Sequence, residues 1–373
     1  MRKGDNLIRI GITYRRERCL HSKSSLIECD LCYRCCPGTA IRQRGDGPQG
    51  PEFDASRCLH CGTCLSACPQ EAFVTSDFSE RKAVGRIVAQ GHARLRCFLP
   101  YGEMDELSSR EDSYQLGTCL AALSPGALFE IAFDRPCMLD TARCGKCALY
   151  HTVAPILAHN VRSASLLLGD WRREGNLADS AALILNETFS PRESQPDSFN
   201  PEASVRHLFR LLKAKETVKP VSGKWDVQTI ENHRTAWRQS LKARWTQAQP
   251  GQTDGGRYPW PVHRVDGNAC IACGVCMQIC PSGAIHQTLR GDSFSYRFTP
   301  GVCFDCGLCR SVCLQHAITR DHAAMPDPFA PVECYVQRAQ PCERCGGPAL
   351  ERDRVGKYCR QCAIELGIAK ADG

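Results

Sequence analysis

The feature that most constrains this chain is a cysteine motif, C-x2-C-x2-C-x3-C, that recurs along it. Three complete copies use Cys58, Cys61, Cys64 and Cys68; Cys270, Cys273, Cys276 and Cys280; and Cys303, Cys306, Cys309 and Cys313. A fourth, incomplete copy lies in "CDLCYRCCPGTAI", residues 29–41. The copies therefore form two pairs, one in each half of the chain.

This spacing is typical of iron–sulfur ligation. Gaps of two residues let one tight loop place three thiolates against one face of an iron–sulfur cube, while the fourth cysteine points away toward the cube of the partner copy. That crossing explains why the copies occur in pairs. A glycine follows the second cysteine of each complete copy, which permits a positive φ and close approach of backbone N–H groups to the cluster. Zinc is the weaker alternative, because its sites favour two separated C-x2-C pairs.

These residues resemble bacterial-type two-cluster ferredoxins over residues 19–76 and 262–322. The segments "CPQEAF", "CPSGAI", "CLQHAI" and "CPGTAI" align after the fourth ligand. The resemblance implies a βαββαβ fold with two [4Fe–4S] clusters in each domain. In the C-terminal domain it assigns one cluster to Cys270, Cys273, Cys276 and Cys313, and the other to Cys280, Cys303, Cys306 and Cys309. In the N-terminal domain it assigns a regular cluster to Cys36, Cys58, Cys61 and Cys64.

The second N-terminal site departs from this pattern. The cysteines left for it are Cys29, Cys32 and Cys68. Leu26 occupies the position of the missing ligand, so either Cys19, through a longer loop, or Cys35 must complete the site. We favour Cys19, because Cys35 would have to point opposite to its neighbour Cys36. A three-iron cluster is the alternative outcome.

The C-terminal tail carries a different pattern, with two C-x2-C pairs separated by thirteen residues. The four cysteines are Cys342, Cys345, Cys359 and Cys362. Two such knuckles indicate a zinc ribbon with a structural Zn2+. A rubredoxin-like single iron is the electron-carrying alternative.

Residues 85–190 read as an α/β unit with cysteines of their own. We expect strands at "ARLRCFLP" and "RPCMLD", a helix at "CLAALSPGALFEIAF", and further helices at "RSASLLLGDW" and "ADSAALILNETF". The cysteine layout resembles the small [2Fe–2S] domain of methyl-viologen hydrogenase delta-type subunits, which assigns a cluster to Cys97, Cys119, Cys144 and Cys147. Buried free thiols are the alternative. Cys137 and Cys334 are expected to pack as small apolar residues.

The sequence thus predicts an α+β protein. Two ferredoxin-like 2[4Fe–4S] domains, residues 19–80 and 262–325, flank an α/β middle domain (85–190) and a helical linker (191–260), and a zinc ribbon (334–373) follows. Two amphipathic helices are expected in the linker, at residues 202–216 and around Trp237, Leu241 and Trp245. Both are expected to pack on the protein's own core, with docking against a partner subunit as the alternative.

Charge and composition restrict the function. The formal net charge is +7. Four cubes and one zinc, each about −2 with its thiolates, would add about −10 and leave about −3, which argues against nucleic-acid binding. The 27 cysteines in 373 residues, without a signal-peptide pattern or an 18-residue apolar run, favour the reducing cytoplasm, either free or at the periphery of a membrane complex.

We therefore expect an electron-transfer subunit without catalytic residues of its own. It would relay electrons between a donor such as ferredoxin and a partner oxidoreductase of the flavin, molybdenum or heterodisulfide type. A redox or oxygen sensor that grips nucleic acid through the zinc ribbon is one alternative. An enzyme that works at an incompletely ligated cluster is the other.

Overall fold

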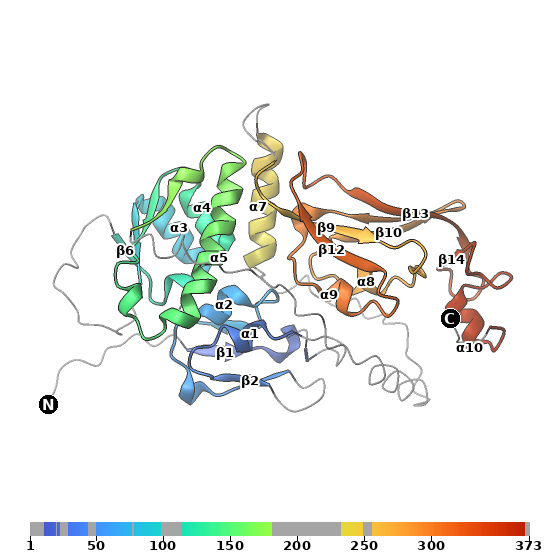
Figure 1. Ribbon diagram of the computed structural model, residues 1–373, viewed down its shortest axis with the longest axis horizontal. Coiled ribbons are helices and arrows are strands. Elements are labelled where there is room, and N and C mark those ends of the chain that lie inside the picture. The colour runs from blue at the N-terminus through green and yellow to red at the C-terminus, as the bar shows by residue number, and fades with distance from the viewer. Residues whose placement is uncertain are drawn as a thin grey trace.

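A computed structural model describes residues 11–19, 21–22, 29–43, 50–76, 78–97, 113–180, 233–248 and 256–369. In Figure 1 the N-terminal domain, in blue, lies below the middle domain, in cyan and green. The C-terminal domain, in orange and red, lies on the other side of a single yellow helix. The helix expected at residues 202–216 lies outside the described residues.

The N-terminal domain has the order strand, helix, strand, strand, helix, strand. Its elements are β1 (Ile12–Tyr14), α1 (Leu31–Arg34), β2 (Ile41–Gln43), β3 (Pro51–Phe53), α2 (Thr63–Ala67) and β4 (Phe73–Thr75). β1 pairs antiparallel with β4, and β2 with β3. Two single-turn 3-10 helices, Arg16–Arg18 and Ala55–Arg57, lead into Cys19 and Cys58. This is the βαββαβ order that the resemblance implies.

The C-terminal domain repeats this order with longer strands. Its elements are β9 (Trp260–Val265), α8 (Val275–Gln278), β10 (Ile285–Arg290), β11 (Ser293–Phe298), α9 (Leu308–Ser311) and β12 (Ile318–Ala323). β9 pairs antiparallel with β12, and β10 with β11. β13 (Val332–Pro341) then pairs with β11 and with β14 (Pro348–Leu350), and α10 (Arg360–Glu365) follows. The strands of the tail therefore extend the β10-β11 sheet of the ferredoxin-like domain, and the tail is not a separate module (Figure 1).

The middle domain is built on a parallel sheet in the order β6-β5-β7-β8. Its strands are β5 (Arg94–Arg96), β6 (Ser113–Gln115), β7 (Cys137–Leu139) and β8 (Leu177–Asp179), and its helices are α3 (Glu80–Gln90), α4 (Pro125–Phe133) and α5 (Tyr150–Gly169). Three further single 3-10 turns are Leu120–Ala122, Cys144–Lys146 and Glu174–Asn176.

Two expectations for this domain need correction. The helix predicted across residues 119–133 is divided, because Pro125 suits a first helical position and the Ser124 side chain accepts the backbone N–H of Ala127 as an N-cap. The helix predicted at residues 178–189 begins with Ala178 and Asp179, but these two residues belong to the strand Leu177–Asp179, which pairs with β7; residues 181–189 lie outside the described part of the chain. Tertiary pairing overrides helix propensity there.

The largest core joins the middle domain to both of its neighbours through α7 (His233–Gln247). Leu241 is fully buried in this core, and Trp237 and Trp245 pack against it half-buried. α7 approaches α4 closely, because Gly126 leaves space for the ring of Trp237 that a Cβ would occupy. The prediction that this helix packs on the protein's own core is confirmed. None of the helices within the described ranges is both long and apolar enough to cross a membrane.

Candidate metal centres

The tail brings four thiols together around one point. The sulfur atoms of Cys342, Cys345, Cys359 and Cys362 all lie within 4.8 Å of one another. The backbone N–H of Cys359 donates to the Cys342 sulfur at 3.3 Å. Burial tends to raise the pKa of Cys342, but backbone N–H groups, that of Cys359 first, outweigh burial and lower its pKa to about 6. This all-thiol, N–H-supported set fits a single tetrahedral metal ion.

The C-terminal ferredoxin-like domain places each fourth cysteine beside the other motif. Burial raises the pKa of Cys276, and the neighbouring thiols of Cys273, Cys309, Cys270 and Cys313 raise it further. Burial likewise raises the pKa of Cys309 to about 12, with contributions from Cys306 and Cys280. The thiol of Cys313 also raises the pKa of Cys270 and Cys273, and that of Cys280 raises the pKa of Cys303 and Cys306, in each case after burial. The crossed ligand sets stay a prediction.

The glycine after each second cysteine has the predicted conformation. The φ angles of Gly62, Gly274 and Gly307 are 75°, 78° and 72°, and each residue is the N-cap of a short helix. The loop before that helix can turn this tightly because glycine adopts a positive φ at no steric cost.

The thiols predicted for the regular N-terminal site act on Cys64. Burial raises the pKa of Cys64, followed by the effects of Cys35, Cys61, Cys58 and Cys36. Four of these five thiols are the predicted ligand set. The fifth, Cys35, is only 3% exposed, and its sulfur donates to the Cys32 carbonyl oxygen at 3.4 Å.

The irregular N-terminal site lies around Cys32. Burial raises the pKa of Cys32, and the thiols that raise it further are those of Cys29, Cys68, Cys35 and Cys19. Cys19, which precedes the motif by ten residues, therefore lies beside the three regular members of this site.

The middle domain also brings its four candidate cysteines together. A hydrogen bond with Cys97 raises the pKa of Cys119, and burial raises it further. Burial raises the pKa of Cys144 to about 12, with contributions from Cys97 and Cys147. Cys97, at the end of β5, thus lies close to both Cys119 and the Cys144–Cys147 turn.

The two cysteines left over behave as apolar side chains. Cys137 is 3% exposed within the middle core, and burial alone raises its pKa to about 12. Burial alone also raises the pKa of Cys334, to about 11. No neighbouring thiol contributes to either value, as expected for cysteines that pack and do not ligate.

The sites of different domains are in direct contact. The backbone N–H of Cys119 donates to the Cys61 carbonyl oxygen at 3.2 Å, and the Thr118 hydroxyl donates to the same oxygen at 2.7 Å. The middle-domain thiols therefore adjoin the regular N-terminal site.

On the other side of the N-terminal domain, Cys29 packs against α9. It belongs to a small apolar cluster with Leu308, Val312, Ile279 and Cys306. Cys29 of the N-terminal domain therefore adjoins the second motif of the C-terminal domain.

The tail contacts the loop that carries the first C-terminal motif. Arg352 donates to the carbonyl oxygens of Gly267 and of Cys270, the latter at 2.5 Å. Tyr335, on β13, donates to the Gly267 oxygen at 3.1 Å. The tail thus braces the loop that carries the first C-terminal motif.

Several polar side chains that were missed in the sequence reach predicted ligand sulfurs. The hydroxyl oxygens of Thr63 and Ser282 lie 3.2 and 3.5 Å from the sulfurs of Cys61 and Cys280. Two further contacts are made by nitrogen. The amide of Gln287 donates to the Cys276 sulfur at 3.3 Å, and the Nε2 atom of His263 lies 3.5 Å from the Cys309 sulfur. Both sit on strands next to a cysteine motif. The alternation of inward and outward positions along β9 and β10 was the available sequence signal.

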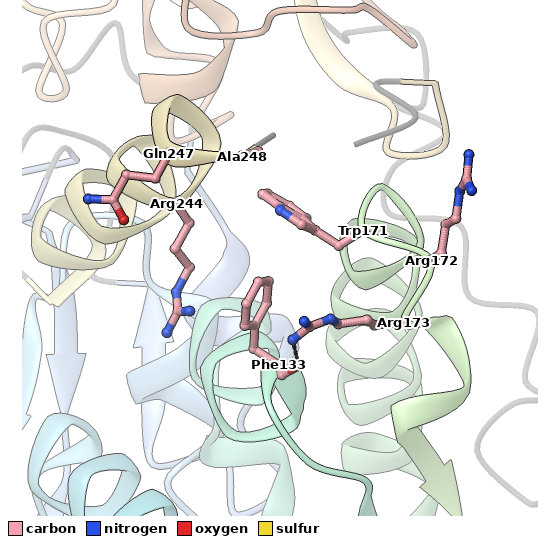
Figure 2. Close-up of a pocket in the computed structure, with 7 residues that line it drawn as sticks. All are labelled: Phe133, Trp171, Arg172, Arg173, Arg244, Gln247 and Ala248. Atoms are coloured by element: carbon pink, nitrogen blue, oxygen red, sulfur yellow. Dashed lines mark hydrogen bonds between the residues drawn. The ribbon is translucent and has the colours of Figure 1, made fainter. Parts of the chain in front are cut away.

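A hollow of about 400 Å3 lies at the C-terminal ends of α4, α5 and α7 (Figure 2). The guanidinium groups of Arg173 and Arg244 lie 4.3 and 4.2 Å from the centre of the Phe133 ring. Arg173 also donates to the Phe133 carbonyl oxygen, and Arg244 pairs with Glu130 at 2.9 Å. Positive charges stabilise helix C-termini, so we interpret these arginines as stabilising the ends of the helices and not as catalytic residues.

Comparison with known proteins identifies two segments of the chain. Residues 27–72 and 269–317 match the family model of the 4Fe–4S dicluster domain. The chain therefore carries two 4Fe–4S dicluster domains, which coincide with the two βαββαβ units, and the prediction of two such domains is confirmed.

Similar proteins include two subunits named NADH-quinone oxidoreductase subunit I. The one from Geobacter metallireducens is 33% identical over 66 residues, which are 16% of this chain and 50% of that protein. The one from Pelobacter propionicus is 33% identical over 60 residues, 13% of this chain and 32% of that protein. Pyruvate synthase subunit PorD from Thermotoga maritima is 36% identical over 59 residues, 16% of this chain and 58% of that protein. The matches thus span between a third and three fifths of these relatives.

Proposed function

We propose that this chain is an iron–sulfur electron-transfer subunit that relays electrons between a donor and a catalytic partner in a larger oxidoreductase. Each bound cluster would supply a site that accepts and releases an electron. The chain's own residues hold these sites in a fixed order and tune them. The observation that carries the proposal is the contact between sites of different domains, through Cys119 on Cys61 and Cys29 on Leu308 and Val312.

The order of sites follows from these contacts. It begins at a [2Fe–2S] site held by Cys97, Cys119, Cys144 and Cys147. It continues through the regular N-terminal cluster of Cys36, Cys58, Cys61 and Cys64 and the irregular one of Cys19, Cys29, Cys32 and Cys68. It ends with the C-terminal clusters of Cys280, Cys303, Cys306 and Cys309, and of Cys270, Cys273, Cys276 and Cys313. A protein that only sensed redox state would need one such site, whereas a relay needs several in contact.

Cys19 is the proposed fourth ligand of the irregular cluster. Its thiol raises the pKa of Cys32, as do those of Cys29 and Cys68 and, ahead of Cys19, that of Cys35. The thiol of Cys35 is engaged with the Cys32 carbonyl oxygen and acts on Cys64 as well. A complete set of four thiolates also argues against an enzyme that uses an open iron position at this cluster.

The tail is proposed to hold a structural Zn2+ through Cys342, Cys345, Cys359 and Cys362. Four thiolates close the coordination sphere of the metal and leave no position for a substrate. Its role would be to fix β13 and the tail against the loop of the first C-terminal motif, where Arg352 makes its contacts.

The partner is proposed to be the catalytic part of an oxidoreductase, with ferredoxin or a similar carrier as donor, in the cytoplasm. Support comes from the names of the relatives, which are subunits of NADH-quinone oxidoreductase and of pyruvate synthase. The catalytic group of the partner, whether flavin, molybdenum or a heterodisulfide-type centre, would perform the chemistry.

The test is metal content and electron paramagnetic resonance of protein purified without air. We expect about sixteen irons from four cubes, about two more from the middle site, and one zinc. Reduction should give signals broadened by interaction between neighbouring clusters. Protein that stays free of iron after anaerobic reconstitution contradicts the proposal, and isolated, non-interacting signals contradict the relay.

A further inference from the structure

His263 is a polar side chain buried inside the C-terminal domain. It lies on β9, is only 6% exposed, and its ring stacks on Phe298 with centroids 3.8 Å apart and planes 17° from parallel. Its Nδ1 atom is 3.1 Å from the hydroxyl of Tyr296, and its Nε2 atom is 3.5 Å from the sulfur of Cys309. Both ring nitrogens therefore have a partner inside the domain.

The chemistry of the partners fixes the direction of these hydrogen bonds. A thiolate that ligates iron can only accept, so Nε2 must carry the proton and donate to Cys309. A neutral imidazole then has a free lone pair on Nδ1, which accepts the hydroxyl proton of Tyr296. Tyr296 is fully buried, so this hydroxyl is held in place by the core. The stacked ring and the buried hydroxyl together aim one N–H group at one ligand sulfur.

The N-terminal domain lacks this device at the corresponding positions. The strand pairings show that β1 corresponds to β9. Tyr14 pairs with Phe73, the first residue of the strand that follows the second N-terminal motif. In the same way Val265 pairs with Ile318, the first residue of the strand that follows the second C-terminal motif. Two residues earlier, Ile12 stands where β9 has His263.

The same comparison applies to the hairpins. Phe53 pairs with Ile41 in one hairpin, and Phe298 pairs with Ile285 in the other, so Phe53 corresponds to Phe298. Two residues before each, Pro51 of β3 therefore corresponds to Tyr296 of β11. Ile12 packs in one apolar cluster with Cys64, the counterpart of Cys309. The N-terminal domain thus offers its sulfur an alkyl side chain in place of an N–H donor.

We propose that His263, positioned by Tyr296, raises the reduction potential of the cluster held by Cys280, Cys303, Cys306 and Cys309 above that of its N-terminal counterpart. An N–H group donated to a ligand sulfur stabilises the reduced cluster, because reduction adds negative charge to the sulfurs. Because of His263 and Tyr296, an electron on the series of clusters is most stable in the C-terminal domain. Electrons therefore move preferentially toward that domain. The inference rests on the proposed function, because it requires the clusters.

The decisive experiment is a potentiometric titration of the full chain, followed by electron paramagnetic resonance at fixed pH. His263→Leu and Tyr296→Phe should each move one reduction wave to lower potential and leave the other waves in place. For His263→Leu we expect about a tenfold loss in the equilibrium constant of reduction, which is about 59 mV for one electron. His263→Gln, which keeps an amide donor, should recover part of the shift.

Two further variants guard against a merely structural effect. His286→Leu replaces an exposed histidine of β10 in the same domain and should move no wave. Ile12→His introduces an N–H donor beside Cys64 and should raise the reduction potential of one cluster of the N-terminal domain. Damage to the fold would not raise a reduction potential in this way. Should His263→Leu fail to load its cluster, Tyr296→Phe and Ile12→His still decide the question.

The outcomes separate the two proposals. Unmoved waves in His263→Leu and Tyr296→Phe with full iron content, or an equal shift in His286→Leu, overturn the role of His263 and leave the relay intact. Absence of iron from the unmodified protein overturns the relay itself.

Discussion

Helix α7 holds the middle and C-terminal domains together, and Trp245 is the residue on which this role can be tested. Its ring makes edge-to-face contacts with Trp171 at 5.0 Å and with Trp260 at 6.0 Å, and a tilted contact with Phe329 at 6.0 Å. Trp171 follows α5, whereas Trp260 and Phe329 belong to the C-terminal domain. Trp245→Ala removes the ring that is common to these three contacts.

The expected cost follows from burial and ring geometry. A tryptophan side chain buries roughly 150–250 Å2 when enclosed, and about half of this at ~25 cal/mol per Å2 gives about 2 kcal/mol. Three aromatic pairs add about 0.5 kcal/mol each at the low end of their range. The sum, about 3.5 kcal/mol, agrees with the lower values for Trp→Ala in protein cores, as suits a half-buried ring.

The measurement is thermal unfolding of the cluster-loaded protein under anaerobic conditions. A loss of about 3.5 kcal/mol should lower the melting temperature by about 7–14 °C for a unit of this size. Gln239→Ala, at an exposed position of the same helix, is the matched control and should stay within about 0.5 kcal/mol of the parent. A Trp245→Ala variant as stable as this control would refute the reasoning that α7 fastens the two domains.

Three further predictions concern the metal sites. Cys313→Ser should lower iron content by about four per chain and remove the cluster of the preceding motif, that of Cys270, because the fourth ligand crosses between motifs; loss of the cluster of its own motif instead would contradict the crossing. Cys19→Ser should lose or convert one N-terminal cluster in magnetic resonance spectra, whereas Cys35→Ser should keep all four cubes, and the reverse result would make Cys35 the ligand. Cys345→Ser should release about one zinc by elemental analysis and leave the iron unchanged; a loss of iron equal to one atom per chain would instead indicate a rubredoxin-like centre.

The sequence alone determined the parts of this protein that depend on local spacing. Four thiols within eleven residues dictate a tight ligand loop, and the glycine after the second cysteine dictates its positive φ, so the spacing suffices to predict ligand loops at Cys58–Cys68 and Cys270–Cys280. The C-x2-C pairs of the tail are local in the same way, and the βαββαβ order of both domains came with the resemblance.

Other features were outside the reach of local spacing. Ala178 and Asp179 were predicted helical but lie in the strand Leu177–Asp179, because pairing with β7, about forty residues earlier, decides their conformation. The place of Cys19 and the gathering of Cys97 with Cys119 and Cys144 were left open by the sequence, since each depends on how separate loops pack.

The tertiary structure alone decided how the sites are connected. Nothing in the sequence around Cys119 or Cys29 indicates that one donates to Cys61 and the other packs on α9. His263 lies 46 residues from Cys309 and reaches it because β9 crosses the domain beside the second motif. Ligand loops are formed by neighbours along the chain, whereas the order of the sites and the donor aimed at one sulfur arise from contacts that only the packed domains create.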